Sequence, residues 1–109
     1  MRGAVSKGDA RAAADFFTSM QAPGGGFVAH ARAPEADLLS TFTALVSLSV
    51  LGALGRADLP AVARFARSLA VPAGGFRASA SDAEADVEYT YYGLAAAALL
   101  KLHAADRAR

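Results

Sequence analysis

Four carboxylic acids alternate along a short segment in the second half of the chain, at Asp82, Glu84, Asp86 and Glu88. In an extended backbone every second side chain lies on the same face, so these four would together offer oxygen ligands to a hard divalent cation. Acids also gather in solvated loops and at the start of a helix, where the partial positive charge of the N-terminus favours them. We favour this second interpretation.

Asp86 has an equivalent in the first half of the chain, Asp37. For both residues we expect an N-cap or a hydrogen bond that fixes a loop. The alternative for Asp86 is a role as a metal ligand, with Glu88 beside it.

Two glycine pairs, Gly25-Gly26 and Gly74-Gly75, could form phosphate-binding loops. They lack the Lys-Ser/Thr that follows the glycines of a P-loop, and each pair comes after an expected helix, where glycine commonly ends the helix. We therefore interpret both as helix-terminating turns, with Phe27 and Phe76 as anchors that hold each following loop. We expect the two histidines, His30 and His103, to face solvent, and we find no Ser/His/Asp or Cys/His arrangement that supports nucleophilic catalysis.

The spacing of these residues is duplicated. A shift of 49 residues aligns residues 9–54 with residues 58–103 without a gap, and 17 of the 46 aligned pairs are identical. The identical pairs other than alanine are Asp9/Asp58, Phe16/Phe65, Ser19/Ser68, Pro23/Pro72, Gly25/Gly74, Gly26/Gly75, Phe27/Phe76, Glu35/Glu84, Asp37/Asp86, Thr41/Thr90, Leu45/Leu94 and Leu51/Leu100. A duplication of this length indicates a repeat architecture. We assign repeat 1 to residues 9–54, repeat 2 to residues 58–103, a lead-in to residues 1–8 and a frayed tail to residues 104–109.

Each repeat predicts two helices joined by a glycine-rich loop. Apolar residues at helical spacing predict one-sided helices over residues 10–21 and 59–70, with Asp9 and Asp58 as N-caps. Nearly uncharged segments predict helices over residues 38–54 and 86–103 that are apolar on most sides. The chain is rich in alanine and poor in β-branched residues, so we expect an all-α fold of four helices in two αα-hairpins, without a β-sheet.

A helix that is apolar on most sides has to be covered by neighbours on both flanks. Two hairpins leave two flanks open. We therefore expect further repeats, self-association or a partner subunit to complete the fold.

Composition excludes several classes of protein. The 109 residues contain no cysteine, and a net charge of +1 arises from interspersed acids and bases, which argues against a nucleic-acid partner. The first residues include no apolar core of signal-peptide length, so we expect a cytoplasmic protein. Residues 38–54 carry no charge and approach membrane-span length, but their alignment with residues 87–103, which include Glu88 and Lys101, favours a helix buried in protein over a membrane span.

A Gly-Gly-Phe turn, then a loop of about nine residues, then Asp-x-x-Tyr-Thr opening a Leu/Ala-rich helix stands here as GGF followed by ADVEYTYYGLAAAALL. This pattern resembles the prenyltransferase/squalene oxidase repeat, which occurs in protein prenyltransferase β subunits and squalene cyclases. The segment ADVEYTYYGLA is most similar to late repeats of the type II (Rab) geranylgeranyltransferase β subunit. The structural motif comprises Gly25, Gly26, Phe27, Asp37, Gly74, Gly75, Phe76, Asp86 and Thr90.

The resemblance implies an α/α toroid, in which five to six such hairpins surround an aromatic-lined cavity for an isoprenoid chain. Two interpretations then remain for the aromatic residues early in the apolar helices: they line this cavity, or they fill the hairpin core. These residues are Phe42, Tyr89, Tyr91 and Tyr92.

The resemblance also implies a zinc site built from an Asp-x-Cys pair at the start of one inner helix and a His at the start of a later one. Asp86 matches the Asp, but Glu88 stands at the Cys position. If repeat 2 instead corresponds to the His-bearing repeat, Tyr89 stands at the His position. The resemblance therefore implies zinc only for a complete toroid, in which Asp86 and Glu88 are the positions to consider.

Three functions follow as hypotheses. The first is part of a prenyltransferase-like toroid that transfers a geranylgeranyl or farnesyl group from its diphosphate to a thiol. The second is a non-catalytic repeat module for protein interaction or self-assembly. The third, terpene cyclisation, ranks last because the Asp-x-Asp-Asp motif of squalene cyclases is absent from the sequence.

Overall fold

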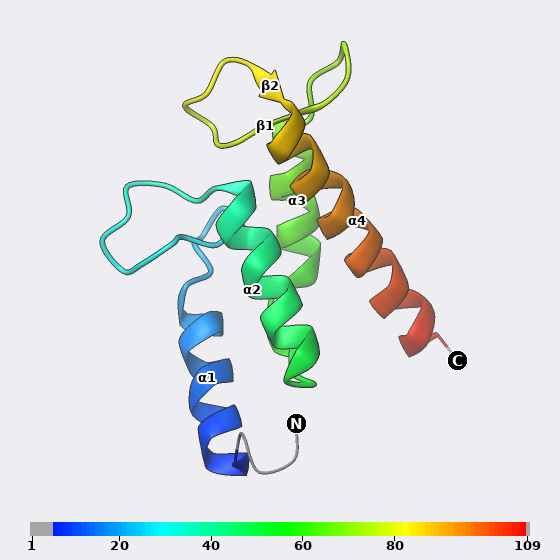
Figure 1. The fold of residues 1–109 in the computed structure, drawn as a ribbon. Coiled ribbons are helices and arrows are strands. Elements are labelled where there is room, and N and C mark those ends of the chain that lie inside the picture. The colour runs from blue at the N-terminus through cyan, green and yellow to red at the C-terminus, as the bar shows by residue number, and fades with distance from the viewer. Residues whose placement is uncertain (1–5, 109) are drawn as a thin grey trace.

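The computed structural model describes residues 6–108, and four α-helices account for most of them (Figure 1). They are α1 (Lys7–Ser19), α2 (Leu38–Val50), α3 (Leu59–Leu69) and α4 (Val87–Arg107). A short 3₁₀ turn, η1 (Leu54–Arg56), joins α2 to α3. The all-α class and the order of two αα-hairpins are confirmed.

The starts of the helices follow the predicted caps with one exception. Asp37, Asp58 and Asp86 each accept a hydrogen bond from the backbone N–H three residues ahead, which satisfies one of the free donors of a helix N-terminus. The cap predicted for Asp9 is wrong: the cap of α1 is Ser6, whose Oγ accepts from the Asp9 N–H at 3.0 Å. Consequently α1 includes Lys7 and Gly8, which we had placed in the lead-in; residues 1–5 of that segment lie outside the described part of the chain.

The ends of the helices differ more from prediction. α2 stops at Val50, before the predicted residue 54, because Gly52 adopts a φ of +70° and the chain turns into η1. α4 continues to Arg107, although we expected residues 104–109 to be frayed. Two alanines, Ala104 and Ala105, are the strongest helix formers and carry the helix onward.

A two-stranded antiparallel sheet contradicts the expectation of no sheet. β1 (Phe76–Arg77) pairs with β2 (Ala85–Asp86), with Phe76 opposite Asp86 and Arg77 opposite Ala85. The two strands flank residues 78–84 in the connection between α3 and α4, where extended backbone groups still require hydrogen-bond partners. Each strand has only two residues, so local pairing here outweighs the helix propensity of the chain.

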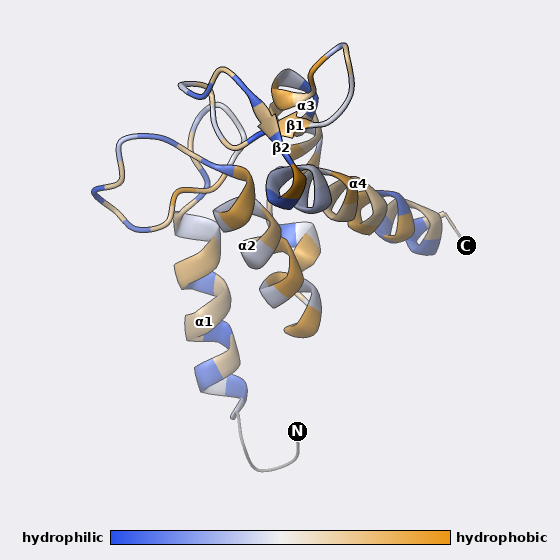
Figure 2. Cartoon of the chain, turned by 45° about the horizontal axis from the view of Figure 1, so that its top comes forward, coloured by the Kyte–Doolittle hydropathy of each residue, from blue (hydrophilic) through white to orange (hydrophobic). Residues whose placement is uncertain are grey.

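The helices form two layers, in which α2 and α4 lie side by side and make the most extensive helix–helix contact (Figure 1). α1 packs on α2, and α3 packs on α4. Figure 2 shows that apolar residues dominate α2, whereas polar and apolar residues are mixed along α1. The main core cluster lies between these helices and comprises Ala14, Phe27, Ala44, Leu45, Leu48, Leu54, Ala57, Val62 and Ala96.

One side of α4 has no cover. Large apolar side chains that are at least 60 % exposed lie along it: Val87, Tyr91, Leu94 and Leu102. The uncovered flank predicted for a pair of hairpins is therefore present. Within residues 6–108, no helix combines the length and the apolar character needed to cross a bilayer.

Candidate functional site

The four aromatic residues that the sequence singled out come together at one end of the α2–α4 seam. The ring of Phe42 stacks on that of Tyr92, with centroids 5.5 Å apart, and meets the edge of Tyr91 at 5.9 Å. Tyr92 also makes edge contacts with Tyr89 and Tyr91, each at 5.6 Å. We call these four residues the aromatic cluster.

The duplicated register explains why the cluster forms. Phe42 and Tyr91 are equivalent positions of the two repeats, and α2 and α4 lie side by side and run parallel to each other. The N-terminal turns of the two helices are therefore adjacent, and aromatic residues near both helix starts can contact each other. Offset and edge-to-face pairs of this kind are the favoured arrangements of aromatic rings.

Hydrogen bonding and burial raise the pKa of two phenols of the cluster, Tyr89 and Tyr92. The Tyr92 hydroxyl donates to Glu88 Oε2 at 3.0 Å, and this bond to a carboxylate raises the pKa of Tyr92. Desolvation, followed by the charges of Asp37, Glu88 and Asp86, raises the pKa of Tyr89. At neutral pH Tyr89 and Tyr92 therefore present neutral hydroxyl groups.

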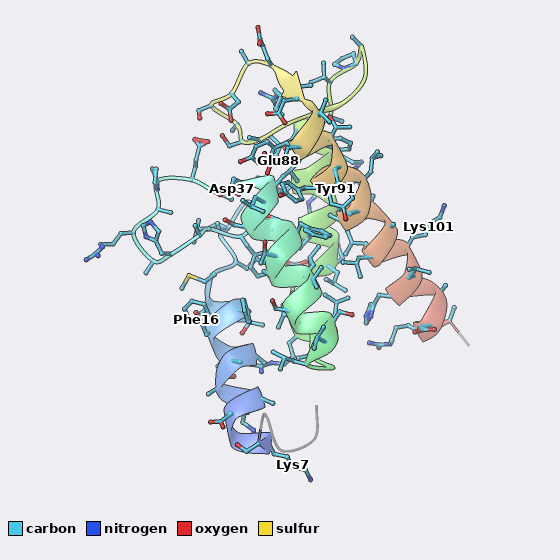
Figure 3. The ribbon with its side chains drawn as sticks, in the orientation of Figure 1. Lys7, Phe16, Asp37, Glu88, Tyr91 and Lys101 are labelled. Atoms are coloured by element: carbon cyan, nitrogen blue, oxygen red, sulfur yellow. The ribbon has the colours of Figure 1, made fainter. Side chains whose placement is uncertain are left out.

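The cluster is an open surface. Tyr91 is 60 % exposed, and the other three rings are partly buried. Figure 3 shows Tyr91 and Glu88 on the first turns of α4, with Asp37 at the start of α2 and Phe16 on α1, across α2 from α4. The surface suits an apolar ligand that lies against rings and needs few polar contacts.

The four alternating acids do not share one extended face. Asp86 Oδ1 accepts from the Tyr89 N–H at 2.8 Å as the cap of α4, and Glu88 lies in the first helical turn and binds Tyr92. Asp82 accepts from Ser79 within the loop. In the described part of the chain, no three His, Cys, Asp or Glu side chains gather closely enough to hold a metal ion. Since the sequence also lacks cysteine, the donor set does not fit the family's zinc, and no zinc chemistry is assigned to these residues.

The duplicated Gly-Gly-Phe motif is held by a threonine, Thr90 of the predicted structural motif in repeat 2 and its equivalent Thr41 in repeat 1. The Phe27 N–H donates to Thr41 Oγ1 at 2.9 Å, and the Phe76 N–H donates to Thr90 Oγ1 at the same distance. Thr41 Oγ1 also donates to the Asp37 carbonyl at 2.7 Å. Each threonine thus ties a phenylalanine anchor to the helix that follows it, and these helices position the aromatic cluster.

The polar contacts between the two hairpins could not be predicted from single residues of the sequence. The Gln21 amide donates to the Asp58 carbonyl at 3.0 Å and accepts from the Asp58 N–H at 2.9 Å. Glu35 Oε1 accepts from the Ser81 N–H at 3.2 Å, and hydrogen bonds from Ser81 and then Ser79 lower the pKa of Glu35. Neither Gln21 nor Ser81 is repeated at its equivalent position, so the duplication gave no signal for them.

A family model described as the prenyltransferase alpha-alpha toroid domain matches residues 2–109. A search of curated proteins finds no match. The matched range includes both hairpins and the whole aromatic cluster.

Proposed function

Because this chain belongs to the prenyltransferase alpha-alpha toroid domain family, we propose that it is a prenyltransferase-like repeat protein whose aromatic cluster binds an isoprenoid chain. The observation that supports the proposal is the convergence of Phe42, Tyr91 and Tyr92 from two different hairpins onto one partly exposed surface. Rings from both repeats then act together on one ligand.

The chemistry of the ligand matches the surface. An isoprenoid chain is a branched, unsaturated hydrocarbon, and its burial against aromatic faces removes apolar area from water. The Tyr92 hydroxyl already donates to Glu88 Oε2, so this polar group keeps its hydrogen bond when the rings cover a hydrocarbon. The cluster therefore binds the hydrocarbon part of a prenyl diphosphate and leaves the diphosphate to other groups.

For the reaction, we propose transfer of a prenyl group from its diphosphate to a thiol. In such a transfer the thiol loses its proton, a carbon–sulfur bond forms between the prenyl group and the sulfur, the carbon–oxygen bond breaks, and diphosphate leaves. This chain contributes a wall for the prenyl group, as a member of a larger toroid that resembles the type II geranylgeranyltransferase β subunit in its ADVEYTYYGLA segment. Cytoplasmic location is part of the same proposal.

Titration with a fluorescent farnesyl or geranylgeranyl diphosphate analogue tests the binding role. Replacing the exposed ring in Tyr91→Ala removes part of the contact surface, and we expect the Kd to rise by about tenfold. Leu102→Ala is the matched control, because Leu102 is a similarly exposed apolar residue on the same helix, outside the cluster. Equal Kd values for wild type and Tyr91→Ala, or full competition by inorganic diphosphate alone, would refute the proposal.

A second candidate, a non-catalytic module for protein interaction or self-assembly, is favoured by the uncovered apolar side of α4 and by the lack of a metal donor set among residues 6–108. It predicts association without binding of the prenyl analogue. Terpene cyclisation has no comparable support.

A further inference from the structure

The buried face of α2 is repeated on α4, where it is exposed. In α2, Leu38 and Leu45 are fully buried against the second hairpin. Their equivalents 49 residues later are Val87 and Leu94, which are 90 % and 61 % exposed. α4 therefore carries the same kind of apolar face as α2, without a hairpin to cover it.

The second glycine turn is open in the same way. A Cβ added at Gly25 would collide with the Ala61 carbonyl, and one at Gly26 would lie 2.6 Å from the Phe65 ring, so α3 sits directly on the first turn. At Gly74, the equivalent of Gly25, nothing lies within 4 Å. The second turn thus has space for a helix placed as α3 is placed on the first.

The opposite flank of the molecule carries the complementary surface. Leu38 shares a cluster with side chains from the second hairpin, namely Phe65, Ala66, Leu69, Phe76, Tyr89 and Tyr92. Their equivalents in the first hairpin are Phe16, Phe17, Met20, Phe27, Ser40 and Thr43. All of these except Phe27, which is fully buried, line one groove of about 170 Å³, and Phe16 is 53 % exposed. The groove is an unfilled version of the site that receives Leu38, and Val87 is the unburied equivalent of Leu38.

Charge supports the same pairing. Glu35 of the first hairpin contacts the backbone of Ser81 in the second. At the equivalent positions stand Glu84 and Arg32, both exposed and opposite in charge. A second molecule placed on the first by the repeat operation would bring Glu84 close to the partner molecule's Arg32 position, where the two charges attract.

We propose that this chain associates head to tail with a second copy of itself: the Val87–Leu94 face of α4 and the second glycine turn of one molecule receive α1 and α2 of the next. Because the two surfaces are different, the interface is heterologous, and repetition leads to a closed ring or an open array. The association gives the self-assembly candidate a specific geometry, and it requires no isoprenoid, so it can hold where the proposed isoprenoid binding fails.

The copy–copy interface is weaker than the contact between the hairpins of one chain. The ion pair between Arg56 and Asp15, 2.6 Å long, has Lys7 and Arg64 at the equivalent positions, which repel each other. The double hydrogen bond of Gln21 to Asp58 is also lost, because Ala70 stands at the position equivalent to Gln21. We therefore expect association that depends on protein concentration.

Sedimentation velocity of the full chain over a wide range of concentrations tests the proposal. We expect reversible association of the wild type and at least a tenfold weaker association of Val87→Glu. Ala98→Glu is the control: Ala98 is exposed, and its equivalent, Ser49, stays exposed although α2 is covered, so this variant should associate like the wild type. Circular dichroism and the urea midpoint of dilute samples check that both variants fold.

Disulfide trapping tests the geometry, because the natural sequence has no cysteine. Val87→Cys and Thr43→Cys chains, mixed and oxidised, should form a mixed dimer in preference to either homodimer. A monomer at every concentration overturns the proposal and leaves the α4 face to a further repeat or another protein. Unchanged association of Val87→Glu, or predominant Val87→Cys homodimers, overturns it as well.

Discussion

Replacing Thr41 with valine tests the hydrogen bond that holds the first Gly-Gly-Phe motif. Thr41 is completely buried, and its Oγ1 accepts from the Phe27 N–H, which belongs to an equally buried residue. Valine keeps the shape and the β-branch of threonine, so the substitution removes the acceptor without opening a cavity. The Asp37 carbonyl, which also loses the hydroxyl donor, keeps its bond from the Thr41 N–H at 3.0 Å.

The expected cost is therefore that of one buried N–H without a partner, about 1–3 kcal/mol. Domains of this size have a free energy of unfolding of about 5–15 kcal/mol, and a loss of 1 kcal/mol lowers the Tm by about 4–8 °C. Thr41→Val should consequently unfold at a clearly lower urea concentration, with an unchanged m-value.

Urea unfolding followed by circular dichroism at low protein concentration measures this cost. Thr43→Val is the control, because the Thr43 hydroxyl is exposed and donates only to the Leu39 carbonyl within its own helix; we expect a change below about 0.5 kcal/mol. Thr90→Val should fall between the two, since Thr90 makes the equivalent bond at a partly buried position. If Thr41→Val costs no more than Thr43→Val, the motif is not held in the way we describe.

Three further predictions concern the loops. Gly25→Ala should destabilise the fold more than Gly74→Ala. Both glycines have positive φ, which costs alanine about 1–2 kcal/mol, but only an alanine at position 25 would also collide with α3. Equal urea midpoints for the two variants would contradict this. Asp37→Ala removes the cap of α2 and should cost about 0.5–2 kcal/mol in the same assay, whereas Asp37→Asn should retain most of the stability. The pKa of Glu35 is lower in the folded than in the unfolded state, so its hydrogen bonds stabilise the fold above the unfolded pKa and are lost as the pH falls through the folded pKa. Urea midpoints measured across this acid range should therefore change less for Glu35→Gln than for the wild type.

The fold could be predicted as far as it is encoded by local signals repeated twice. Asp37 and Asp86 predict helix starts, and Gly25 and Gly74 predict turns, because each residue type satisfies a backbone requirement within a few residues of itself. Their recurrence at one spacing made each assignment support the other.

What escaped prediction depends on contacts between segments distant in sequence or on small local competition. The β1–β2 pair forms because the loop brings Phe76 back to Asp86. Of the four residues in the two strands, Phe76 alone has a strong preference for β-structure, so the sequence does not predict the pair. The cap of α1 was assigned to Asp9 and not to Ser6 because both are good capping residues within one helical turn, and residue preference does not distinguish them. The aromatic residues were identified, but their convergence required knowing that α2 and α4 are adjacent.

Leu45 and Leu94 show what determines burial in this chain. They are the same residue type at the same position of the repeat, yet one is fully buried and the other is 61 % exposed. The difference is therefore set by the neighbouring hairpin, which covers α2 and is missing beside α4. The same neighbour brings Tyr91 and Tyr92 against Phe42, so the contact that buries the inner helix also builds the aromatic cluster.

A second copy bound to α4 would bring its own Phe42 beside Tyr91 and extend the aromatic surface by one ring. Association and isoprenoid binding would then share one structural element, the lateral contact between inner helices, and each would change the affinity of the other by the same factor.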